Sequence, residues 1–382
     1  MKRAFLLTIL FAAAPIATMA YAGDLLLRLG PEELVQAGGA NISVLGYSVP
    51  SLADWDNDGL NDLIVGEGGG GYTEGKVRIY INAGTASQPQ FTTYFYAQAN
   101  GGNLTCPGSG CLGCFPRVVY WDADARKDLL VGQADGKVKL FLNIATDENP
   151  TFGAGSFLQV GPLASKANID AGDRATPSAV DWNSDGKKDL VVGALDAKIH
   201  LFINEGTDTA PDFRVQTFAQ ANGSDLLVPP SRSSPDVLDL NGDGKKDILT
   251  GNYNGELLFY SNTGADAEPN FAGYESVESD GVPIDLAGTP RSRPFVCDWT
   301  ADGYPDVLIG AGDGKVHLYQ SIPQPGDTDK DYDVESDDFA LLALQWGATD
   351  CGYCGGADFF DDDQINMLDV LTLAEHWLEG CE

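Results

Sequence analysis

The sequence predicts an all-β fold, a five-bladed β-propeller, followed by a small all-α domain. Three observations predict it. A short acidic motif recurs five times at nearly regular spacing, each copy follows a proline by four positions, and the composition changes abruptly after Gly326. A motif that recurs at a fixed period constrains the fold more strongly than any single element does.

The acidic motif first occurs as DWDNDGLNDLIVG from Asp54. Similar stretches begin at Tyr120, Asp181, Asp239 and Asp298, so successive starts are separated by 66, 61, 58 and 59 residues. The prolines that precede them are Pro50, Pro116, Pro177, Pro235 and Pro294. This register indicates one structural unit repeated five times.

Each unit contains four strand signals separated by turn glycines. They are the segment before the acidic loop, the apolar run after it, a strand such as KVKLFLN, and a fourth strand after a P-x-F element. A four-stranded unit repeated around a ring is typical of a β-propeller, in which each blade buries its faces against its neighbours.

The ends of the repeat region predict how the ring closes. The fifth unit stops after KVHLYQS without a fourth strand, and residues 24–49 resemble the missing piece. We therefore expect five blades, with the first strand completing the last blade. The alternative is a wider ring with blades that the sequence does not reveal.

The acidic loops resemble the calcium loops of FG-GAP and VCBS repeat proteins, which include the propellers of integrin α chains, and the resemblance covers residues 24–322. It implies that each D-x-[DN]-x-D-G-x-x-D loop joins the first two strands of a blade and binds Ca²⁺. Short acidic and amide side chains at alternate positions supply the oxygens that this hard cation prefers, and glycine permits the sharp turn. The implied side-chain and main-chain ligands are Asp54, Asp56, Asp58, Leu60 and Asp62 in the first loop, Asp181, Asn183, Asp185, Lys187 and Asp189 in the third, Asp239, Asn241, Asp243, Lys245 and Asp247 in the fourth, and Asp298, Thr300, Asp302, Tyr304 and Asp306 in the fifth.

The second loop departs from this pattern. Tyr120 replaces the first aspartate, Ala125 replaces the glycine, and Arg126 and Lys127 add positive charge. We expect this loop to hold no calcium. The alternative interpretation of all five loops is solvated acidic turns.

Residues 327–382 form the predicted second domain, joined to the propeller at residues 23–321 by a linker at 322–326. Two similar segments 31 residues apart each combine an acidic loop with an amphipathic helix, and they resemble a type I dockerin. The resemblance implies two further calcium loops similar to EF-hands. Their implied ligands are Asp327, Asp329, Asp331, Asp333, Glu335 and Asp338 in the first loop, and Asp358, Asp362, Gln364, Asn366 and Asp369 in the second.

The resemblance also implies a partner. Dockerins dock onto a cohesin domain through loop positions 10 and 11, which here are Ser336 and Asp337, then Met367 and Leu368. These differ from the Ser-Thr pairs of cellulosomal dockerins. We therefore expect a cohesin-like or other surface or scaffold protein as the partner of the tail.

The composition of the chain constrains where the protein acts and which ligands it binds. Residues 1–22 have the charged start, apolar run and small-x-small end of a secretory signal peptide, and no later segment is apolar enough to span a bilayer. We expect a secreted, extracellular or cell-surface protein. The net charge of −33 argues against nucleic acid as a partner.

The seven cysteines suit an exported protein. Cys106, Cys111 and Cys114 predict a disulfide-stapled loop, with a metal site as the alternative. Cys297 lies on a predicted strand, and Cys351, Cys354 and Cys381 lie in the second domain, where one bridge is expected but its pairing stays open.

The leading prediction for function is a calcium-stabilised binding, adhesion or scaffold module. No nucleophile motif is present, and we expect His200 and His317 on blade surfaces. The alternative is a polysaccharide-degrading enzyme, a glycoside hydrolase or lyase, that uses acids such as Asp173 and Asp225.

The predicted ligand face lies opposite the acidic loops. Arg174, Arg232 and Arg291 each stand three positions before the repeat proline, and Arg293 and Arg117 are close by. Arginines at the same position of successive repeats would gather at one end of the central channel of the ring, the channel mouth. There they would bind an acidic polysaccharide or another anionic ligand, including a protein. The alternative is that they pair with aspartates such as Asp173.

Overall fold

The computed structural model describes residues 25–68, 74–108, 113–122, 124–286, 288–349, 357–359 and 364–378. The predicted signal peptide lies outside these ranges, as do Cys111, Cys351, Cys354 and Cys381. In the described part of the chain, no helix has the length and apolar character that crossing a membrane requires.

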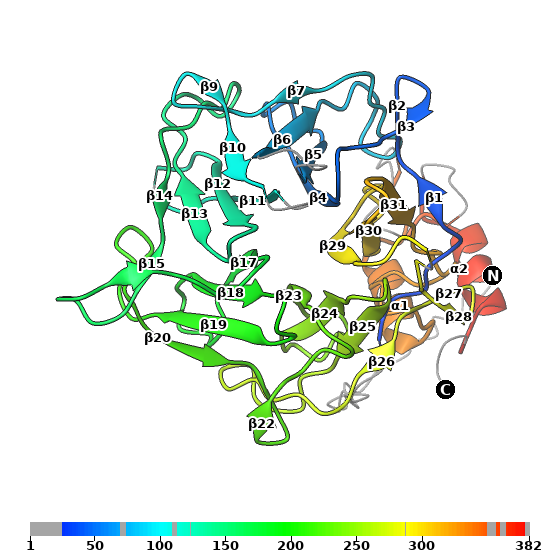
Figure 1. Ribbon diagram of the computed structural model, residues 1–382. Helices are drawn as coiled ribbons and strands as arrows, with labels where there is room; N and C mark the ends of the chain where they lie inside the picture. Colours follow the sequence, from blue (N-terminus) through cyan, green and yellow to red (C-terminus); the bar gives the residue numbers. More distant parts are fainter. Residues whose placement is uncertain are drawn as a thin grey trace, which may run out of the picture.

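Five antiparallel sheets, each with a path of four strands, surround a central axis (Figure 1). The innermost strands are β4 (Ser48–Ala53), β11 (Cys114–Val119), β17 (Thr176–Val180), β23 (Ser234–Leu238) and β29 (Arg293–Cys297). The second strands are β5 (Asp62–Glu67), β12 (Asp128–Gln133), β18 (Asp189–Gly193), β24 (Asp247–Gly251) and β30 (Asp306–Gly310). The third strands are β6 (Glu74–Tyr80), β13 (Val138–Phe141), β19 (Ile199–Asn204), β25 (Leu257–Tyr260) and β31 (Val316–Tyr319). The outer strands are β7 (Phe95–Tyr96), β14 (Ser156–Phe157), β20 (Phe213–Phe218), β26 (Glu275–Ser276) and β1 (Glu33–Leu34). The prediction of a five-bladed propeller is therefore confirmed.

The second strands are buried along their whole length, because a neighbouring blade covers each face. This burial explains their unbroken apolar runs. Close packing of the blades also explains the glycine that recurs at the end of these runs, because a side chain would not fit there. A Cβ at Gly132 would lie 2.0 Å from the Ala175 carbonyl oxygen of the next blade. At Gly310 it would lie 2.3 Å from the Ser48 carbonyl oxygen, so the fifth blade packs against the first as tightly as any other pair.

The N-terminal segment closes the ring, as predicted. Strand β1 pairs antiparallel with β31, with Glu33 opposite Leu318 and Leu34 opposite His317. Leu29, which is buried, bridges to Ser321 and Ser279. In the other blades this bridging position is filled by a phenylalanine of the P-x-F element: Phe91, Phe152, Phe213 and Phe271.

Short hairpins follow the outer strands and reach the next blade. They are β2 (Gln36–Ala37) with β3 (Ala40–Asn41), β8 (Gln98–Ala99) with β9 (Gly102–Asn103), β15 (Gln159–Val160) with β16 (Ala167–Asn168), β21 (Gln220–Ala221) with β22 (Ser224–Asp225), and β27 (Glu278–Ser279) with β28 (Val282–Pro283). The first blade has an additional strand, β10 (Thr105–Pro107), on β6. A disulfide joins Cys106 to Cys114, which confirms a stapled loop here, and Cys297 is the free cysteine among the described residues.

The C-terminal segment contains two short helices, α1 (Ser336–Leu344) and α2 (Met367–Glu375). Each begins with a capping box, formed by Glu335 with Asp338 and by Asn366 with Asp369. A small apolar core joins the two halves through Val334, Leu342, Ala357, Ile365 and Leu373. The dockerin resemblance of this segment stays a prediction.

Two histidines do not lie where the sequence interpretation placed them. His200 and His317 are only 3% and 4% exposed, so the expectation of a surface position is wrong. His200 contacts Gln216 and Asp196 through its two ring nitrogens, and His317 contacts Glu32 and Asp313 in the same way. Each histidine lies on the third strand of its blade, and its ring contacts a polar side chain on or beside the outer strand.

Candidate functional site

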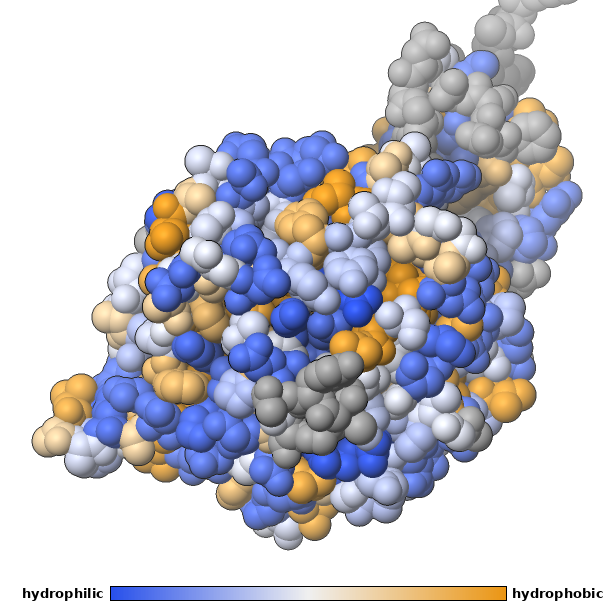
Figure 2. All heavy atoms as spheres, turned by 45° about the horizontal axis from the view of Figure 1, so that its top comes forward, coloured by the Kyte–Doolittle hydropathy of each residue, from blue (hydrophilic) through white to orange (hydrophobic). Residues whose placement is uncertain are grey.

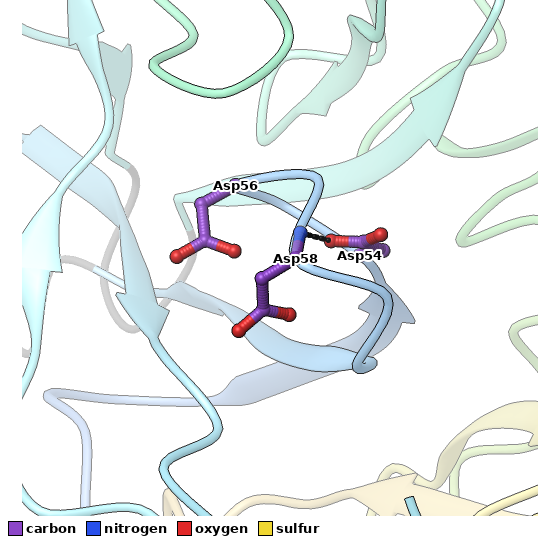
Figure 3. A group of neighbouring side chains, drawn as sticks. All are labelled: Asp54, Asp56 and Asp58. Carbon is purple, nitrogen blue, oxygen red and sulfur yellow. Dashed lines mark hydrogen bonds between the residues drawn. The ribbon is translucent and has the colours of Figure 1, made fainter.

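The first acidic loop brings three carboxylates together. Asp54, Asp56 and Asp58 each offer an oxygen within 4.8 Å of the others (Figure 3). Asp54 accepts hydrogen bonds from the main-chain nitrogens of Asp58 at 3.1 Å and Gly59 at 3.0 Å, which curls the loop around the carboxylates. Asn57 and Gly59 adopt left-handed backbone angles, with φ of 60° and 92°, that permit this tight turn.

The fit of a calcium ion to this loop rests on an unsatisfied oxygen. Oδ1 of Asp56 is buried and has no hydrogen-bond partner. Burial, with repulsion from Asp58 and Asp54, raises the pKa of Asp56. Oγ1 of Thr300, at the same position of the fifth loop, is likewise buried without a partner. Because buried oxygens are normally satisfied, these two atoms fit the donor set of a hard cation.

The last acid of each loop makes main-chain contacts in addition to the metal role predicted for four of the five. Asp62 lies outside the group of three carboxylates; its two oxygens accept hydrogen bonds from the main-chain nitrogens of Trp55 at 2.8 Å and Asn82 at 2.7 Å. The same pair of contacts recurs at Asp128, Asp189, Asp247 and Asp306. Burial raises the pKa of Asp62, Asp247 and Asp306 to about 6. This acid therefore ties the acidic loop to the end of the third strand, whatever it contributes to a metal.

A sequence signal for this structural role was present. The second loop lacks the first aspartate and the glycine but keeps Asp128. Its Ala125 adopts a φ of 61°, the left-handed region that glycine serves in the other loops. Asp128 therefore makes the two main-chain contacts in a loop that lacks the rest of the metal pattern.

The second loop also contains its own cation. Nε of Arg126 donates to Oδ2 of Asp124 at 2.8 Å. Lysines make similar contacts in two other loops, Lys187 with Asp185 at 3.1 Å and Lys245 with Asp243 at 2.9 Å. The first and fifth loops have Leu60 and Tyr304 at this position and carry no such charge.

The C-terminal segment contains the second group of three carboxylates, Asp327, Asp329 and Asp331. Burial raises the pKa of Asp327 to about 6 and that of Asp329 to about 7, the latter with repulsion from Asp331. Oδ1 of Asp333 is buried and unpartnered. Tyr332, where glycine is usual, has a φ of 68°.

The second C-terminal loop is described in part. Asp358, Gln364, Asn366 and Asp369 lie in the described residues, and Asp362 lies outside them. Asp369 accepts hydrogen bonds from the main-chain nitrogens of Phe359 at 2.9 Å and Asn366 at 2.8 Å. Asp338 does the same in the first loop, with Glu335 at 2.8 Å. The final acids of the two loops are therefore equivalent.

The first C-terminal loop lies directly on the fifth propeller loop. The hydroxyl of Tyr304 donates to Oδ2 of Asp327 at 3.0 Å, and the rings of Tyr304 and Tyr332 are 5.0 Å apart. Nζ of Lys330 donates to the main-chain carbonyl of Asp302. Residues 322–326, predicted as a linker, are also held, since Arg28 donates to Gln324 at 2.9 Å.

The arginines predicted to gather at the channel mouth line one narrow cavity of about 20 Å³. The arginines in its wall are Arg174, Arg232, Arg291 and Arg293. Arg117 is not among the lining residues; it lies inside the ring and donates to the carbonyls of Pro50 at 3.1 Å and Pro294 at 3.2 Å. The cavity is on the side of the ring opposite the acidic loops, because these arginines precede the innermost strands and the loops follow them.

The alternative that these arginines pair with aspartates does not hold for three of them. No carboxylate of the described residues forms an ion pair with Arg232, Arg291 or Arg293. Burial, with repulsion from neighbouring arginines, lowers the pKa of Arg293 to about 9 and that of Arg232 to about 10. The mouth is a concentrated positive site on an acidic protein.

Aromatic rings and an unusual backbone hold these side chains. Tyr47 lies under Arg291 at 4.6 Å and Arg293 at 4.9 Å, and Tyr253 covers Arg232 at 4.8 Å. Arg174, Arg232 and Arg291 have φ of 71°, 64° and 83°. Such left-handed residues cost about 1 kcal/mol or more each, and they persist where the surrounding structure fixes the backbone.

One candidate acid of the enzyme alternative, Asp225, is held by basic and amide partners. Asp225 accepts hydrogen bonds from Lys198 at 2.8 Å and Gln220 at 3.0 Å, and the lysine contact lowers its pKa. A general acid needs a raised pKa instead. Figure 2 shows a mainly hydrophilic face with scattered apolar residues.

Comparisons with known proteins agree with the repeat architecture. The family described as FG-GAP-like repeat matches residues 181–250 and 239–309. Residues 181–309 thus carry FG-GAP-like repeats, and they form part of a five-bladed β-propeller. No curated protein sequence matches it.

Solved structures are similar only at low identity. A Photorhabdus luminescens Tc holotoxin pore chain is 14% identical with a TM-score of 0.36, over 76% of this chain but only 12% of that one. The catalytic domain of a Coprinopsis cinerea GH62 α-L-arabinofuranosidase is 11% identical with a TM-score of 0.46, over 77% of this chain and 97% of that one. A GH43_1 enzyme from Xanthomonas citri is 9% identical with a TM-score of 0.41, over 74% and 89%. At such identities and TM-scores, no function is transferred from these structures.

Proposed function

We propose that this chain is an extracellular binding protein whose propeller binds an anionic ligand, such as an acidic polysaccharide, at the arginine mouth. The observation that carries the proposal is the gathering of Arg174, Arg232, Arg291 and Arg293 around one cavity. Clustered arginines are expensive to bury, so a fold that collects them from three blades favours an anion there. A binding role is preferred to catalysis because Asp225, a candidate acid, is held in an ion pair.

Calcium ions would stabilise the propeller from the opposite face. The first loop would hold one through Asp54, Asp56 and Asp58, and the third, fourth and fifth loops would use their equivalent residues. The ion would neutralise carboxylates that otherwise repel one another. The chain's own contribution is the curled backbone, which keeps the acids together.

The C-terminal segment would attach the propeller to a cohesin-like or other surface or scaffold protein. Several apolar side chains on and beside its two helices are exposed, which is unusual unless a partner covers them. They are Phe339 (46%), Leu344 (82%), Trp346 (53%), Met367 (67%), Leu368 (39%), Leu371 (54%) and Trp377 (43%). Met367 and Leu368 occupy two of the predicted partner-reading positions.

Polysaccharide retention tests the ligand proposal. Wild-type protein and an Arg174→Ala, Arg232→Ala, Arg291→Ala triple variant with unchanged melting temperature would be passed over immobilised acidic and neutral polysaccharides. We expect acidic-polysaccharide retention that weakens with salt and is lost in the variant. Equal retention of both proteins would refute the proposal, and release of new reducing ends would favour the enzyme alternative.

A further inference from the structure

The arginine mouth has a geometry that narrows the chemistry of its ligand, and an inference about that chemistry rests on the proposed anionic ligand. Arg174, Arg232 and Arg291 stand at one repeat phase of three consecutive blades, immediately before β17, β23 and β29. They therefore approach the cavity from three directions around the ring axis. Arg293 reaches the same cavity from the start of β29 itself.

Hydrogen-bond donors at this mouth remain unused by the protein. Nε and one terminal nitrogen of Arg232, and Nε of Arg291, are buried without a partner. Oγ of Ser234 is also unpartnered, and Ser234 is only 4% exposed and lines the cavity. Its neighbours Ser233 and Ser292, by contrast, donate to the main-chain carbonyls of Lys198 and Glu256, both at 2.6 Å. These unused donors all belong to residues that line the cavity.

The guanidinium groups are positioned before any ligand arrives. Tyr47 contacts Arg291 and Arg293, and Tyr253 contacts Arg232 at 4.8 Å and Arg291 at 5.5 Å. Cation–π contacts of this kind favour placement of the guanidinium groups over the ring faces. Tyr253 is 40% exposed, so its outer surface stays available above the mouth.

The narrowness of the cavity limits what enters. At about 20 Å³ it does not admit a sugar ring, so a ligand meets the arginines with a small end group at the opening of the cavity. A carboxylate offers two oxygens, whereas a sulfate or phosphate monoester offers three, spread as a tripod. Three arginines that converge from three blades match the tripod.

We propose that the mouth binds one sulfate or phosphate monoester group of its ligand, with Arg174, Arg232 and Arg291 around the oxygens and Ser234 donating from below. The remainder of the ligand lies outside against Tyr253. The group is bound and not cleaved.

Small anions test this directly. The intact protein would be titrated with sodium sulfate, sodium phosphate and sodium acetate at constant ionic strength, and binding would be followed by calorimetry and by the shift in melting temperature. We expect saturable binding of sulfate or phosphate at least tenfold tighter than acetate. Chains bearing sulfate esters, such as dextran sulfate, and phosphate monoesters, such as glucose 6-phosphate, would then distinguish the two sources.

The most informative variant is Arg232→Gly, which removes the guanidinium group. Because glycine adopts a φ of 64° without strain, the substitution should not destabilise the backbone at this position. We expect an unchanged or higher melting temperature and a loss of sulfate binding of at least tenfold. Arg214→Ala is the matched control, since Arg214 pairs with Asp212 and Glu205 far from the mouth, and it should bind as the wild type does. Ser234→Ala should weaken binding less than Arg232→Gly.

Two outcomes overturn the inference. If sulfate, phosphate and acetate bind equally, or if Arg232→Gly binds sulfate as the wild type does, the tripod is refuted. The proposed function fails separately: arginine-dependent retention of a carboxylated polymer such as polygalacturonate, without selective sulfate or phosphate binding, would refute the tripod and leave the anionic ligand in place.

Discussion

The hydroxyl of Tyr304 donates a hydrogen bond to Oδ2 of Asp327 at 3.0 Å. This contact joins the fifth acidic loop of the propeller to the first acidic loop of the C-terminal segment, two predicted calcium sites. Tyr304 is buried, and its ring lies 5.0 Å from that of Tyr332 at an angle of 52°. The tail is therefore packed on the fifth blade, and Gln324 of the predicted linker accepts a hydrogen bond from Arg28.

Removal of the tail should consequently affect the propeller. A chain that ends at Ser321 should still fold, since each pair of blades has its own core, but it leaves Tyr304 uncovered. We expect its melting temperature to fall by several degrees. Tyr304→Ala in the full chain should cost about 2 kcal/mol or more. Identical thermal melting of the full and shortened chains would show that the contact contributes nothing.

A matched pair of substitutions separates calcium binding from local hydrogen bonding. Asp185 and Asp124 make the same contacts, since each accepts from the main-chain nitrogen two residues later, at 3.1 and 2.9 Å, and each pairs with a basic side chain. Asp185→Ala should lower the melting temperature strongly in calcium and little without it. Asp124→Ala should do little in either condition, because an exposed ion pair contributes less than about 1 kcal/mol. Equal effects in calcium would contradict the expectation that the second loop is empty.

Asp128 should matter although its loop is predicted to hold no metal. Its carboxylate accepts from the main-chain nitrogens of Trp121 at 3.1 Å and Asn143 at 2.8 Å, and Asp128→Ala leaves both donors buried and unsatisfied. We expect a loss of about 2–4 kcal/mol in the free energy of unfolding. Urea denaturation would measure it, and the loss should be the same with calcium and with a chelator.

The pH dependence of calcium binding follows from the C-terminal loop. In metal-free protein, burial raises the pKa of Asp327 to about 6 and that of Asp329 to about 7, from 3.8 in each case. The folded state then binds these protons more tightly than the unfolded state, so the stability from these groups is present below about pH 4 and is lost as the pH rises through about 6 to 7. Calcium binds the deprotonated form, and its stabilising effect should therefore grow from about pH 5 to about pH 7.5.

Melting temperatures of calcium-loaded protein and of protein freed of metal on a chelating resin would give this difference at each pH. Asp329→Asn should flatten the dependence, because it removes the group with the highest pKa in that loop. A calcium effect that is constant across this range would contradict the prediction.

The sequence predicted the blades, their number and the ring closure because these depend on a local pattern repeated in register, from Pro50 and Asp54 to Pro294 and Asp298. The gathering of the arginines was also predictable, because residues at the same position of successive repeats lie at the same distance from the ring axis. The roles of His200 and His317 were not predictable. A polar residue in an alternating strand pattern does not reveal which polar side chain of a neighbouring segment it will contact. The packing of Tyr304 on Asp327 joins two unlike segments, so no repeat could reveal it.

The closure of the ring has a mechanical consequence. The last blade is completed by β1, which pairs with β31 and is flanked by the bridge from Leu29 to Ser321, and the chain passes from β31 directly to the C-terminal segment. A ligand held at Arg291 and Arg293 and an anchor at the tail would place any tension across this one blade. The pairing of β1 with β31 closes the ring without a continuous chain between the two strands, so under load we expect the ring to open there by release of β1 from the fifth blade, while the other four blades keep their shape.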